Sequence, residues 1–229
     1  MRLFIDSGSI DDIEEIAAWG VLSGATTNPS LLAHGGQDPA QTIRRMCEAL
    51  GGPVSAEVVT DDLHEMVAQG RRLAAIHKHV VVKLPLGPAG LAATRELVQD
   101  DIRVNMTLVF TAAQALLAAE AGASYVSCFL GRLEDIGHDA VATLGEVIGA
   151  LTADESRPLV LAASIRSPRH VIEAAALGAD VATVPGKVLR QMTEHPLTQA
   201  GIDRFAADWA SVPQPAEWLG NGANPSRVA

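Results

Sequence analysis

The sequence has few cysteines, few basic residues and no long apolar run. Cys47 and Cys128 lie far apart without C-x-x-C spacing, which argues against a disulfide framework or a zinc site and favours a reducing cytoplasm. The 27 acidic residues outnumber the 17 basic ones, so the net charge is −10 and nucleic acid is not an expected partner. No apolar stretch is long enough to span a bilayer, and Asp6 comes too early for a signal peptide. These absences predict a cytoplasmic protein that binds neither nucleic acid nor membranes.

Motifs of several common enzyme classes are missing too. No G-x-G-x-x-G follows the first apolar run and no G-x-x-x-x-G-K-[ST] occurs anywhere, which removes the main support for nucleotide binding. Without a G-x-S-x-G segment, a serine hydrolase is not expected. His77 and His79 form an H-x-H pair, but no third ligand lies at a telling spacing, and we therefore expect no metal site.

Short β-branched runs alternate with longer amphipathic segments along the chain. The expected strands are Leu3–Asp6, Leu22–Thr26, Val54–Val58, Val80–Leu84, Arg103–Leu108, Tyr125–Cys128, Leu159–Ala163 and Val181–Val184. The helical segments between them include Asp61–His77, Ala112–Ala121, Gly137–Leu151 and Pro168–Leu177. Eight alternating units in a chain of this length predict an α/β protein with a (β/α)8 TIM barrel. A doubly wound open sheet is the alternative.

Residues that end helices stand where this alternation requires them. Ser9, Thr60 and Ser167 occupy expected N-cap positions, because their hydroxyls can accept from the first-turn N–H groups. Gly122 and Gly178 follow helical runs and precede strands, which is typical of left-handed C-caps.

Beyond the eighth unit, Pro196–Ala210 is expected to form one additional C-terminal helix, with Thr198 as its N-cap. From about Val212 onward the chain is rich in Pro, Gly and Asn. We therefore expect one barrel domain over residues 1–211, which includes this helix, and a loose tail over residues 212–229. Trp218 and Leu219 in the tail could instead dock on the barrel or on a neighbouring subunit.

The most informative residue is a lysine inside an apolar run, Lys83 in Val80–Pro85. Strands buried on both faces are continuously apolar, and an ammonium group within one is costly unless it pairs with an acid or loses its proton. A neutral amine is a nucleophile towards carbonyl groups. A core lysine in a salt bridge, or one that extends from the strand end, is the structural alternative.

Other polar residues fall at the ends of the expected strands, where (β/α)8 barrels carry their chemistry. Around Lys83 they are Asp6, Thr26, Thr27, Asn28, Glu57, Asn105, Thr107, Arg132, Ser164 and Arg166, and the apolar Phe129 precedes Arg132 at the end of the sixth strand. Asn105 and Thr107 alternate along one strand and therefore share a face. Each residue alone could be an ordinary solvated strand end, but their joint occurrence predicts a site.

These residue types suit the chemistry of a carbonyl substrate. The amine of Lys83 can condense with a ketone, and the resulting iminium is an electron sink for cleavage of the neighbouring C–C bond. Asp6 and Glu57 can move the protons that these steps require.

The remaining polar residues suit recognition of a phosphorylated polyol. Asn28 and Asn105 carry both donors and acceptors for hydroxyl groups. Arg132 and Arg166 can bind a phosphate through charge-assisted hydrogen bonds, aided by the N–H groups at the helix start after Ser167.

Six segments, in order, resemble those of transaldolases. They are Gly24–Leu32, Val81–Pro85, Asn105–Phe110, Gly131–Gly137, Ala162–Pro168 and His195–Thr198. The resemblance runs from about Met1 to Trp209 and is strongest to the short, single-domain transaldolases that neighbour the fructose-6-phosphate aldolases. Cys128 departs from it, since relatives often have proline there, and the C-terminal tail is an addition.

The resemblance implies a cofactor-free transfer of a dihydroxyacetone unit from a ketose phosphate, fructose 6-phosphate or sedoheptulose 7-phosphate, to an aldose phosphate. By motif match, Lys83 would form a Schiff base, Asp6 would assist proton transfer, and Glu57 with Thr107 would hold a catalytic water. The expected substrate-binding residues are Thr26, Asn28, Asn105, Phe129, Arg132, Ser164 and Arg166. Of these, Arg132, Ser164 and Arg166 would bind the phosphate. The resemblance further implies a homo-oligomer, a decamer or pentamer, in which the C-terminal helix packs on a neighbouring subunit.

Three positions separate the two activities of this family. The aldolases have tyrosine at the position of Phe129 and glutamine at that of Glu57, so both residues favour a transaldolase here, and Asn105 agrees. The alternative is a fructose-6-phosphate aldolase that releases free dihydroxyacetone. A catalytically silent barrel that binds sugar phosphates or serves in assembly is a third hypothesis, disfavoured because it would not need the buried lysine.

Overall fold

The computed structural model describes residues 1–35, 38–152 and 156–212. Contacts within the chain divide it into two compact units, Met1–Leu189 and Arg190–Ala229, and each is described here by itself. The expected division into a domain over residues 1–211 and a loose tail stays a prediction, because most of that tail lies outside the described residues.

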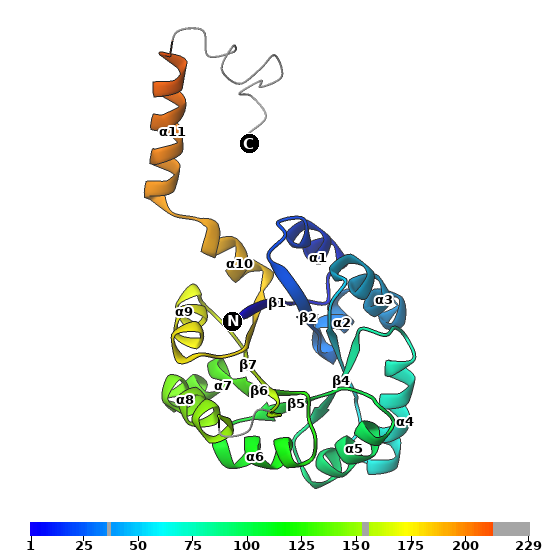
Figure 1. Cartoon of the computed structure of the whole chain (residues 1–229). Coiled ribbons are helices and arrows are strands. Elements are labelled where there is room, and N and C mark those ends of the chain that lie inside the picture. The colour runs from blue at the N-terminus through cyan, green and yellow to red at the C-terminus, as the bar shows by residue number, and fades with distance from the viewer. Residues whose placement is uncertain (36–37, 153–155, 213–229) are drawn as a thin grey trace. The chain divides into compact units, whose positions relative to one another are not determined.

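Eight parallel strands close into a barrel in which β8 pairs with β1 (Figure 1). The strands are β1 (Arg2–Asp6), β2 (Leu22–Thr26), β3 (Val54–Glu57), β4 (Val80–Pro85), β5 (Val104–Val109), β6 (Tyr125–Phe129), β7 (Leu159–Ala163) and β8 (Val181–Pro185). Every strand expected from the sequence is present, and no end differs by more than one residue. The predicted (β/α)8 barrel is confirmed, and the open sheet is excluded.

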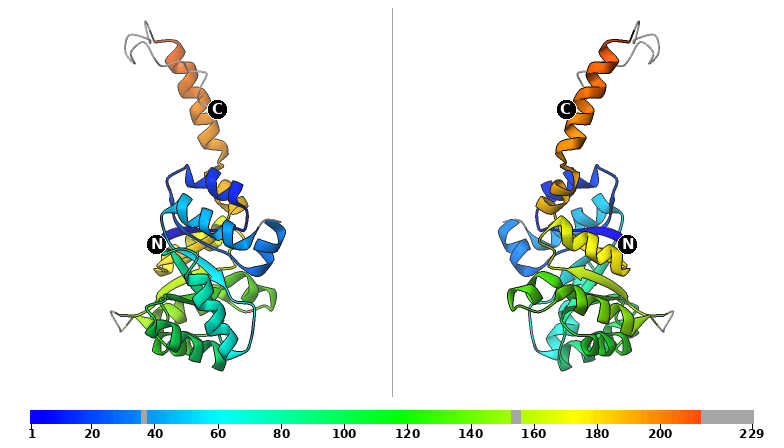
Figure 2. Two further views of the ribbon diagram at one scale, coloured as in Figure 1. Left: turned by 90° about the vertical axis from the view of Figure 1, so that its right-hand side faces the viewer. Right: turned by 90° about the vertical axis from the view of Figure 1, so that its left-hand side faces the viewer.

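Helices cover the outside of the barrel (Figures 1 and 2). They are α1 (Ile10–Ala17), α2 (Pro29–Gly35), α3 (Pro39–Leu50), α4 (Leu63–Ala74), α5 (Pro88–Gln99), α6 (Ala112–Glu120), α7 (Leu130–Asp135), α8 (Ala140–Leu151) and α9 (Pro168–Leu177). A further helix, α10 (Gly186–Thr193), follows β8 and contains the boundary between the two units.

Four of the expected helix ends are confirmed. Ser9 and Ser167 accept hydrogen bonds from first-turn N–H groups of α1 and α9. Gly122 and Gly178 have positive φ angles of 92° and 87°, a conformation that costs glycine little because it has no Cβ. The two serines begin α1 and α9, and the two glycines end α6 and α9 just before the next strand.

Two expected N-caps are wrong. Asp62, and not Thr60, caps α4, because its carboxylate accepts from the N–H of Glu65, the third residue of the helix. Thr60 instead accepts from the N–H of Asp62 in the preceding turn. In the last helix Pro196 fixes the first helical position, so the preceding residue, His195, caps it in place of Thr198.

The barrel interior is filled by a layer of apolar side chains. Phe4 in β1 and Tyr125 in β6 lie with ring centroids 6.3 Å apart although these strands are not neighbours, so both side chains point inward. Val81, Leu161 and Val181 belong to the same buried cluster. Side chains alternate between the faces of a strand, so the residue two positions further on also points inward, nearer the C-terminal end. These next residues are Asp6, Ser127, Lys83, Ala163 and Thr183.

At the N-terminal end of the barrel an ion pair links the starts of β7 and β8. Arg157 donates to both carboxylate oxygens of Asp180, at 2.6 and 3.1 Å, and the N–H of Val160 donates to the same carboxylate at 2.8 Å. Burial opposes the charge of Asp180, but the hydrogen bonds from Arg157 and Val160 outweigh it and hold the pKa of Asp180 below its usual range. This end of the barrel is therefore closed by satisfied polar groups.

The second unit contains α11 (Pro196–Ala210), which confirms the additional C-terminal helix. No residue of α11 is buried, and Leu197, Ile202 and Phe205 are among its exposed apolar side chains. The expected packing of this helix on a neighbouring subunit stays a prediction. Within the described ranges, no helix combines the length and apolar character that a bilayer span needs.

The two cysteines, Cys47 and Cys128, are buried free thiols. Burial raises the pKa of Cys47 to about 11 and that of Cys128 to about 12. Both groups are therefore protonated near neutral pH and do not act as nucleophiles.

Candidate active site

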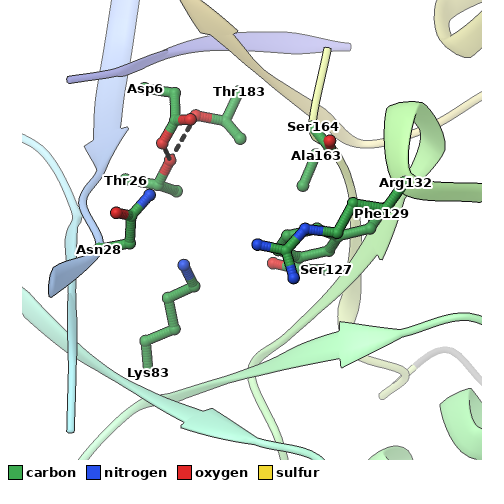
Figure 3. A pocket seen from close by; sticks show the side chains of 10 residues that line it. All are labelled: Asp6, Thr26, Asn28, Lys83, Ser127, Phe129, Arg132, Ala163, Ser164 and Thr183. Carbon is green, nitrogen blue, oxygen red and sulfur yellow. Dashed lines mark hydrogen bonds between the residues drawn. The ribbon is translucent and has the colours of Figure 1, made fainter. Parts of the chain in front are cut away.

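A pocket opens at the C-terminal ends of the strands (Figure 3). It is lined by Asp6, Thr26, Asn28, Lys83, Ser127, Phe129, Arg132, Ala163, Ser164 and Thr183. A second hollow shares Asn28, Lys83, Phe129 and Arg132 with it and adds Pro29, Ser30, Glu57 and Leu108. Of the predicted site residues, all but Thr27, Asn105, Thr107 and Arg166 are among those that line one of the two hollows.

Lys83 lies inside the barrel and is only 5% exposed. Its Nζ atom lies 2.9 Å from Oε2 of Glu57, its neighbour in register on β3, and donates to the carbonyl oxygen of Thr27 at 3.2 Å. The Phe129 ring centroid lies 6.0 Å away. The lysine is thus both paired, as the structural alternative supposed, and directed into the pocket, as the nucleophile hypothesis requires (Figure 3).

Asp6 reaches the pocket from the end of β1 and is held by a hydroxyl. Thr26, its neighbour in register on β2, donates to Oδ1 of Asp6 at 2.7 Å and lies 2.6 Å from the hydroxyl of Thr183 on β8. Burial raises the pKa of Asp6, and the charge of Glu57 adds to that effect, whereas the Thr26 bond and the charge of Lys83 oppose it. The net result is a carboxyl group that holds a proton at higher pH than an ordinary aspartate.

Asn105 lies below the pocket and is fully buried. Its amide nitrogen donates to Ser55 Oγ at 3.0 Å, and its carbonyl oxygen accepts from Ser127 Oγ at 2.7 Å. The structure therefore joins Asn105 to two serines that the sequence analysis did not single out. Both were detectable, because Ser55 and Ser127 stand two residues before Glu57 and Phe129 and therefore share their inward face.

Thr107 is fully buried on β5. Among the buried side-chain polar atoms of the described residues, its hydroxyl is the one without a hydrogen-bonding partner. The next residue, Leu108, has a φ of +58°, which is costly for a branched side chain, and the register of β5 with β6 shifts here. An unpaired hydroxyl beside a strained backbone is typical of a functional position.

Asn28 connects the site to the start of α2. Its Oδ1 accepts from the N–H of Leu31 at 2.9 Å, so the side chain is fixed as a helix cap. That bond uses only the oxygen, and the amide N–H groups remain for a ligand, since Asn28 lines both hollows. Thr27 is less available, because its hydroxyl donates to the carbonyl oxygen of Ser55.

Phe129 and Arg132 form one wall of the site. The guanidinium carbon of Arg132 lies 5.2 Å from the Phe129 ring centroid, and Phe110 packs against the same ring at 6.0 Å. Because α7 begins directly after β6, Arg132 stands one turn beyond the strand end and borders both hollows. Arg132 has no ion-pair partner among the described residues, which leaves it available to an anion.

Arg166 and Ser164 stand in the segment that leads from β7 to α9. Ser164 lines the pocket with a φ of +56°. The guanidinium of Arg166 instead donates to both carboxylate oxygens of Asp135 and lowers the pKa of Asp135. Gly131 permits this path, because a Cβ there would lie 2.5 Å from Nε of Arg166 and 2.5 Å from the carbonyl oxygen of Ser164.

No group of three or more His, Cys, Asp or Glu side chains in the described part of the chain is arranged to hold a metal ion. The charged groups of the site are instead one amine, two carboxylates and one arginine around a pocket. Such a set can bind a carbonyl compound covalently and move protons beside it.

Comparison with known proteins agrees with the motif resemblance over almost the whole chain. A family model described as Transaldolase/Fructose-6-phosphate aldolase matches residues 3–215. The chain belongs to this family. A probable transaldolase of Thermus thermophilus is 53% identical over 221 residues, which is 93% of this chain and 99% of that protein. Probable transaldolases of Heliobacterium modesticaldum and Caldicellulosiruptor saccharolyticus are 50% and 49% identical, with the same shares covered.

The chain is accordingly an enzyme of the transaldolase and aldolase type, and sugar phosphates fit its family as substrates. Among solved structures, a mandelate oxidase mutant with an FMN adduct superposes with a TM-score of 0.58 at 19% identity. That match covers 81% of this chain and 64% of the oxidase. At such low identity it shows the barrel fold alone.

Proposed function

We propose that this family member is a transaldolase that works through a Schiff base on Lys83. It would transfer a dihydroxyacetone unit from fructose 6-phosphate or sedoheptulose 7-phosphate to an aldose phosphate. The observation that carries the proposal is the amine of Lys83, buried in the barrel 2.9 Å from Glu57 and directed into a polar pocket. A lysine placed only for stability would have no need of a pocket at its amine.

Schiff-base formation begins with a proton transfer. The ammonium of Lys83 passes a proton to Glu57, directly or through a water held by Glu57 and Thr107, and the free amine attacks the C2 carbonyl of the ketose. The carbinol oxygen receives that proton and a second one from the attacking nitrogen and leaves as water, and the iminium remains on Lys83. The unpaired Thr107 hydroxyl supports this assignment, since it has a hydrogen bond to offer such a water.

Cleavage of the sugar then needs a base at the C4 hydroxyl. Asp6 takes that proton, the electron pair of the C3–C4 bond moves towards the iminium, and an aldose phosphate leaves behind an enamine on Lys83. The enamine attacks the aldehyde of the acceptor, and Asp6 returns its proton. The raised pKa of Asp6 suits a group that must both take and give a proton near neutral pH.

Recognition of the phosphate would fall to Arg132, Ser164 and Arg166. Arg132 borders the pocket without an ion-pair partner in the described chain. Arg166 would have to exchange Asp135 for the phosphate, and that exchange costs little because both side chains are about half exposed. Asn28 and the Asn105–Ser127 pair would bind the donor hydroxyls.

Phe129, which lies beside the amine of Lys83, is the reason for proposing transfer of the dihydroxyacetone unit and not its release. Release requires protonation of the enamine, and Phe129, whose ring centroid lies 6.0 Å from Nζ of Lys83, has no hydroxyl to supply the proton. The sole tyrosine of the chain, Tyr125, lies in the apolar layer below the site. The enamine would therefore persist until an aldehyde arrives.

The test is release of glyceraldehyde 3-phosphate from fructose 6-phosphate, with and without erythrose 4-phosphate. Release only with the acceptor supports a transaldolase, and release without it supports the aldolase alternative. Borohydride added with fructose 6-phosphate should reduce the iminium and leave one substrate-derived adduct on the wild type and none on Lys83→Met, as measured by mass spectrometry. A Lys83→Met protein that is still labelled or active would refute the Schiff base at Lys83.

A further inference from the structure

Thr183 lines the pocket but has no part in the proposed reaction steps. It lies on β8, where its side chain follows the apolar Val181 on the inward face, and it is 2% exposed. Its Oγ1 lies 2.6 Å from Oγ1 of Thr26, which lies 2.7 Å from Oδ1 of Asp6 (Figure 3). Closure of the barrel brings the three side chains together, since β8 and β2 both pair with β1.

Counting hydroxyl protons fixes the direction of this chain. Thr26 has one hydroxyl proton, and an ionised Asp6 can only accept, so Thr26 donates to Asp6. The contact between the two threonines must then be a donation from Thr183 to Thr26. When Asp6 takes up a proton, it can donate to Thr26, and Thr26 can donate to Thr183. In that state no bond of the chain is charge-assisted, so the two hydroxyls support the ionised carboxylate of Asp6 more strongly than the protonated acid.

We propose that Thr183 is a positioning residue for proton transfer by Asp6, acting through the hydroxyl of Thr26. This inference rests on the proposed function, in which Asp6 exchanges a proton with the substrate. Donation by Thr183 polarises the Thr26 hydroxyl and strengthens its bond to the carboxylate, because consecutive hydrogen bonds reinforce one another. Thr183 thus stabilises the charged form of Asp6 against the effect of burial.

Other charged groups face Asp6 and set its background. Lys83 on β4 favours the carboxylate, Glu57 on β3 disfavours it, and Arg132 on α7 borders the same pocket. None of them contacts Thr183 through a described hydrogen bond or ion pair. Replacing Thr183 therefore changes the support of Asp6 while leaving these charges in place.

The decisive comparison is Thr183→Val with Thr183→Ser. Valine keeps the shape and removes the hydroxyl, so Asp6 should ionise at higher pH and the acid limb of the kcat profile should move up by about half a pH unit. At pH values on the acid side of the midpoint, the kcat of Thr183→Val should be about three-fold lower than that of wild type. Serine keeps the hydroxyl and should restore the limb. Thr183→Ala, which also lacks the hydroxyl, replaces valine if Thr183→Val does not fold.

Thr94→Val is the matched control. Its hydroxyl is equally buried but donates to the carbonyl oxygen of Gly90 within α5, away from the pocket. This variant should lose stability and leave the acid limb unmoved. An acid limb of Thr183→Val that coincides with wild type would overturn the proposal. A raised KM with an unmoved limb would overturn it too, since it would assign Thr183 a direct contact with substrate.

A titration without turnover separates this inference from the proposed function. Carbon-13 NMR of protein labelled at aspartate carboxyl carbons follows Asp6 directly, with its resonance identified by its absence in Asp6→Asn. The Asp6 resonance should titrate at higher pH in Thr183→Val than in wild type or Thr183→Ser, and equal midpoints would sink the inference. An inactive wild type with the expected NMR shift would instead refute the transaldolase proposal alone.

Discussion

The two ends of the barrel use polar side chains in opposite ways. At the N-terminal end, Arg157 and Asp180 satisfy one another and the N–H of Val160. At the C-terminal end, the Thr107 hydroxyl has no partner among the described residues, and Leu108 has a left-handed backbone conformation. The first arrangement satisfies its buried polar groups. The second leaves an unpaired hydroxyl and a strained backbone at the pocket.

The difference teaches where this fold is built for stability and where for chemistry. Strained conformations and unpaired buried groups cost free energy, so they persist where function requires them and the rest of the barrel compensates. Substitutions at the pocket should therefore change activity more than stability. Substitutions at the opposite end should change stability and leave activity intact.

The largest effect is expected for Lys83→Met. Loss of the nucleophile should lower kcat by roughly 10⁴-fold or more. The melting temperature should stay close to wild type, because methionine fills the same space and Glu57 can neutralise by taking up a proton. Activity assays and calorimetry on one preparation check both outcomes. A large loss of stability would show that the ion pair with Glu57 supports the fold. It would contradict the view that the pocket end of the barrel serves activity and not stability.

Thr107→Val should lower kcat by roughly 10- to 100-fold, because the water between Thr107 and Glu57 loses one partner. The matched control is Thr94→Val, whose hydroxyl has a backbone acceptor. The free energy of unfolding of Thr94→Val should fall by about 1 kcal/mol, and its activity should stay unchanged. The free energy of unfolding of Thr107→Val should fall by less than that. Denaturant unfolding and steady-state kinetics test the pair, and equal kcat values for the two variants would contradict the assignment of Thr107.

At the other end, Asp180→Asn should lower the free energy of unfolding by about 1–3 kcal/mol without changing kcat. The pKa of Asp180 is lowered in the folded protein, so its contribution is present above the unfolded pKa and is lost as pH falls through the folded value. The gap between wild type and variant should therefore be constant at neutral pH and shrink below about pH 4. Denaturant titrations at several pH values measure it.

The control for that variant is Glu14→Gln, which removes an ion pair with Arg45 in which both side chains are exposed, 49% and 41% respectively. Its cost should stay within about 0.5 kcal/mol, as for other exposed pairs. A loss as large as that of Asp180→Asn would mean that any ion pair of this protein stabilises it equally.

The smallest effect is expected for Phe129→Tyr. A phenolic hydroxyl near Lys83 could protonate the enamine, so release of dihydroxyacetone without acceptor should rise by roughly three- to ten-fold. Phe110→Tyr adds the same hydroxyl to the neighbouring ring and should leave the release unchanged. Glyceraldehyde 3-phosphate formation without erythrose 4-phosphate measures both. Equal rates for wild type and Phe129→Tyr would remove the argument from Phe129.

Much of the site was visible in the sequence, because strand periodicity is local. Lys83 interrupts an apolar run, and Asp6, Glu57 and Thr107 fall near strand ends, so the pattern alone predicted that they share one rim. The structure brings Asp6, Lys83 and Glu57 to two adjoining hollows. Ser55 and Ser127 were missed, since a serine inside a strand carries no signal as clear as a buried charge.

The sequence by itself determined the eight β/α units, the place of each strand and a lysine inside an apolar strand, because these follow from alternation and spacing along the chain. Only the tertiary structure decided the partners. Arg166 pairs with Asp135 across 31 positions, and Thr183 reaches Thr26 across 157. Several acceptors stand within the sequence for each of these donors, and hydrogen bonds form only at short range and in the right direction. For Thr183 the choice was made when the closing barrel set β8 beside β1.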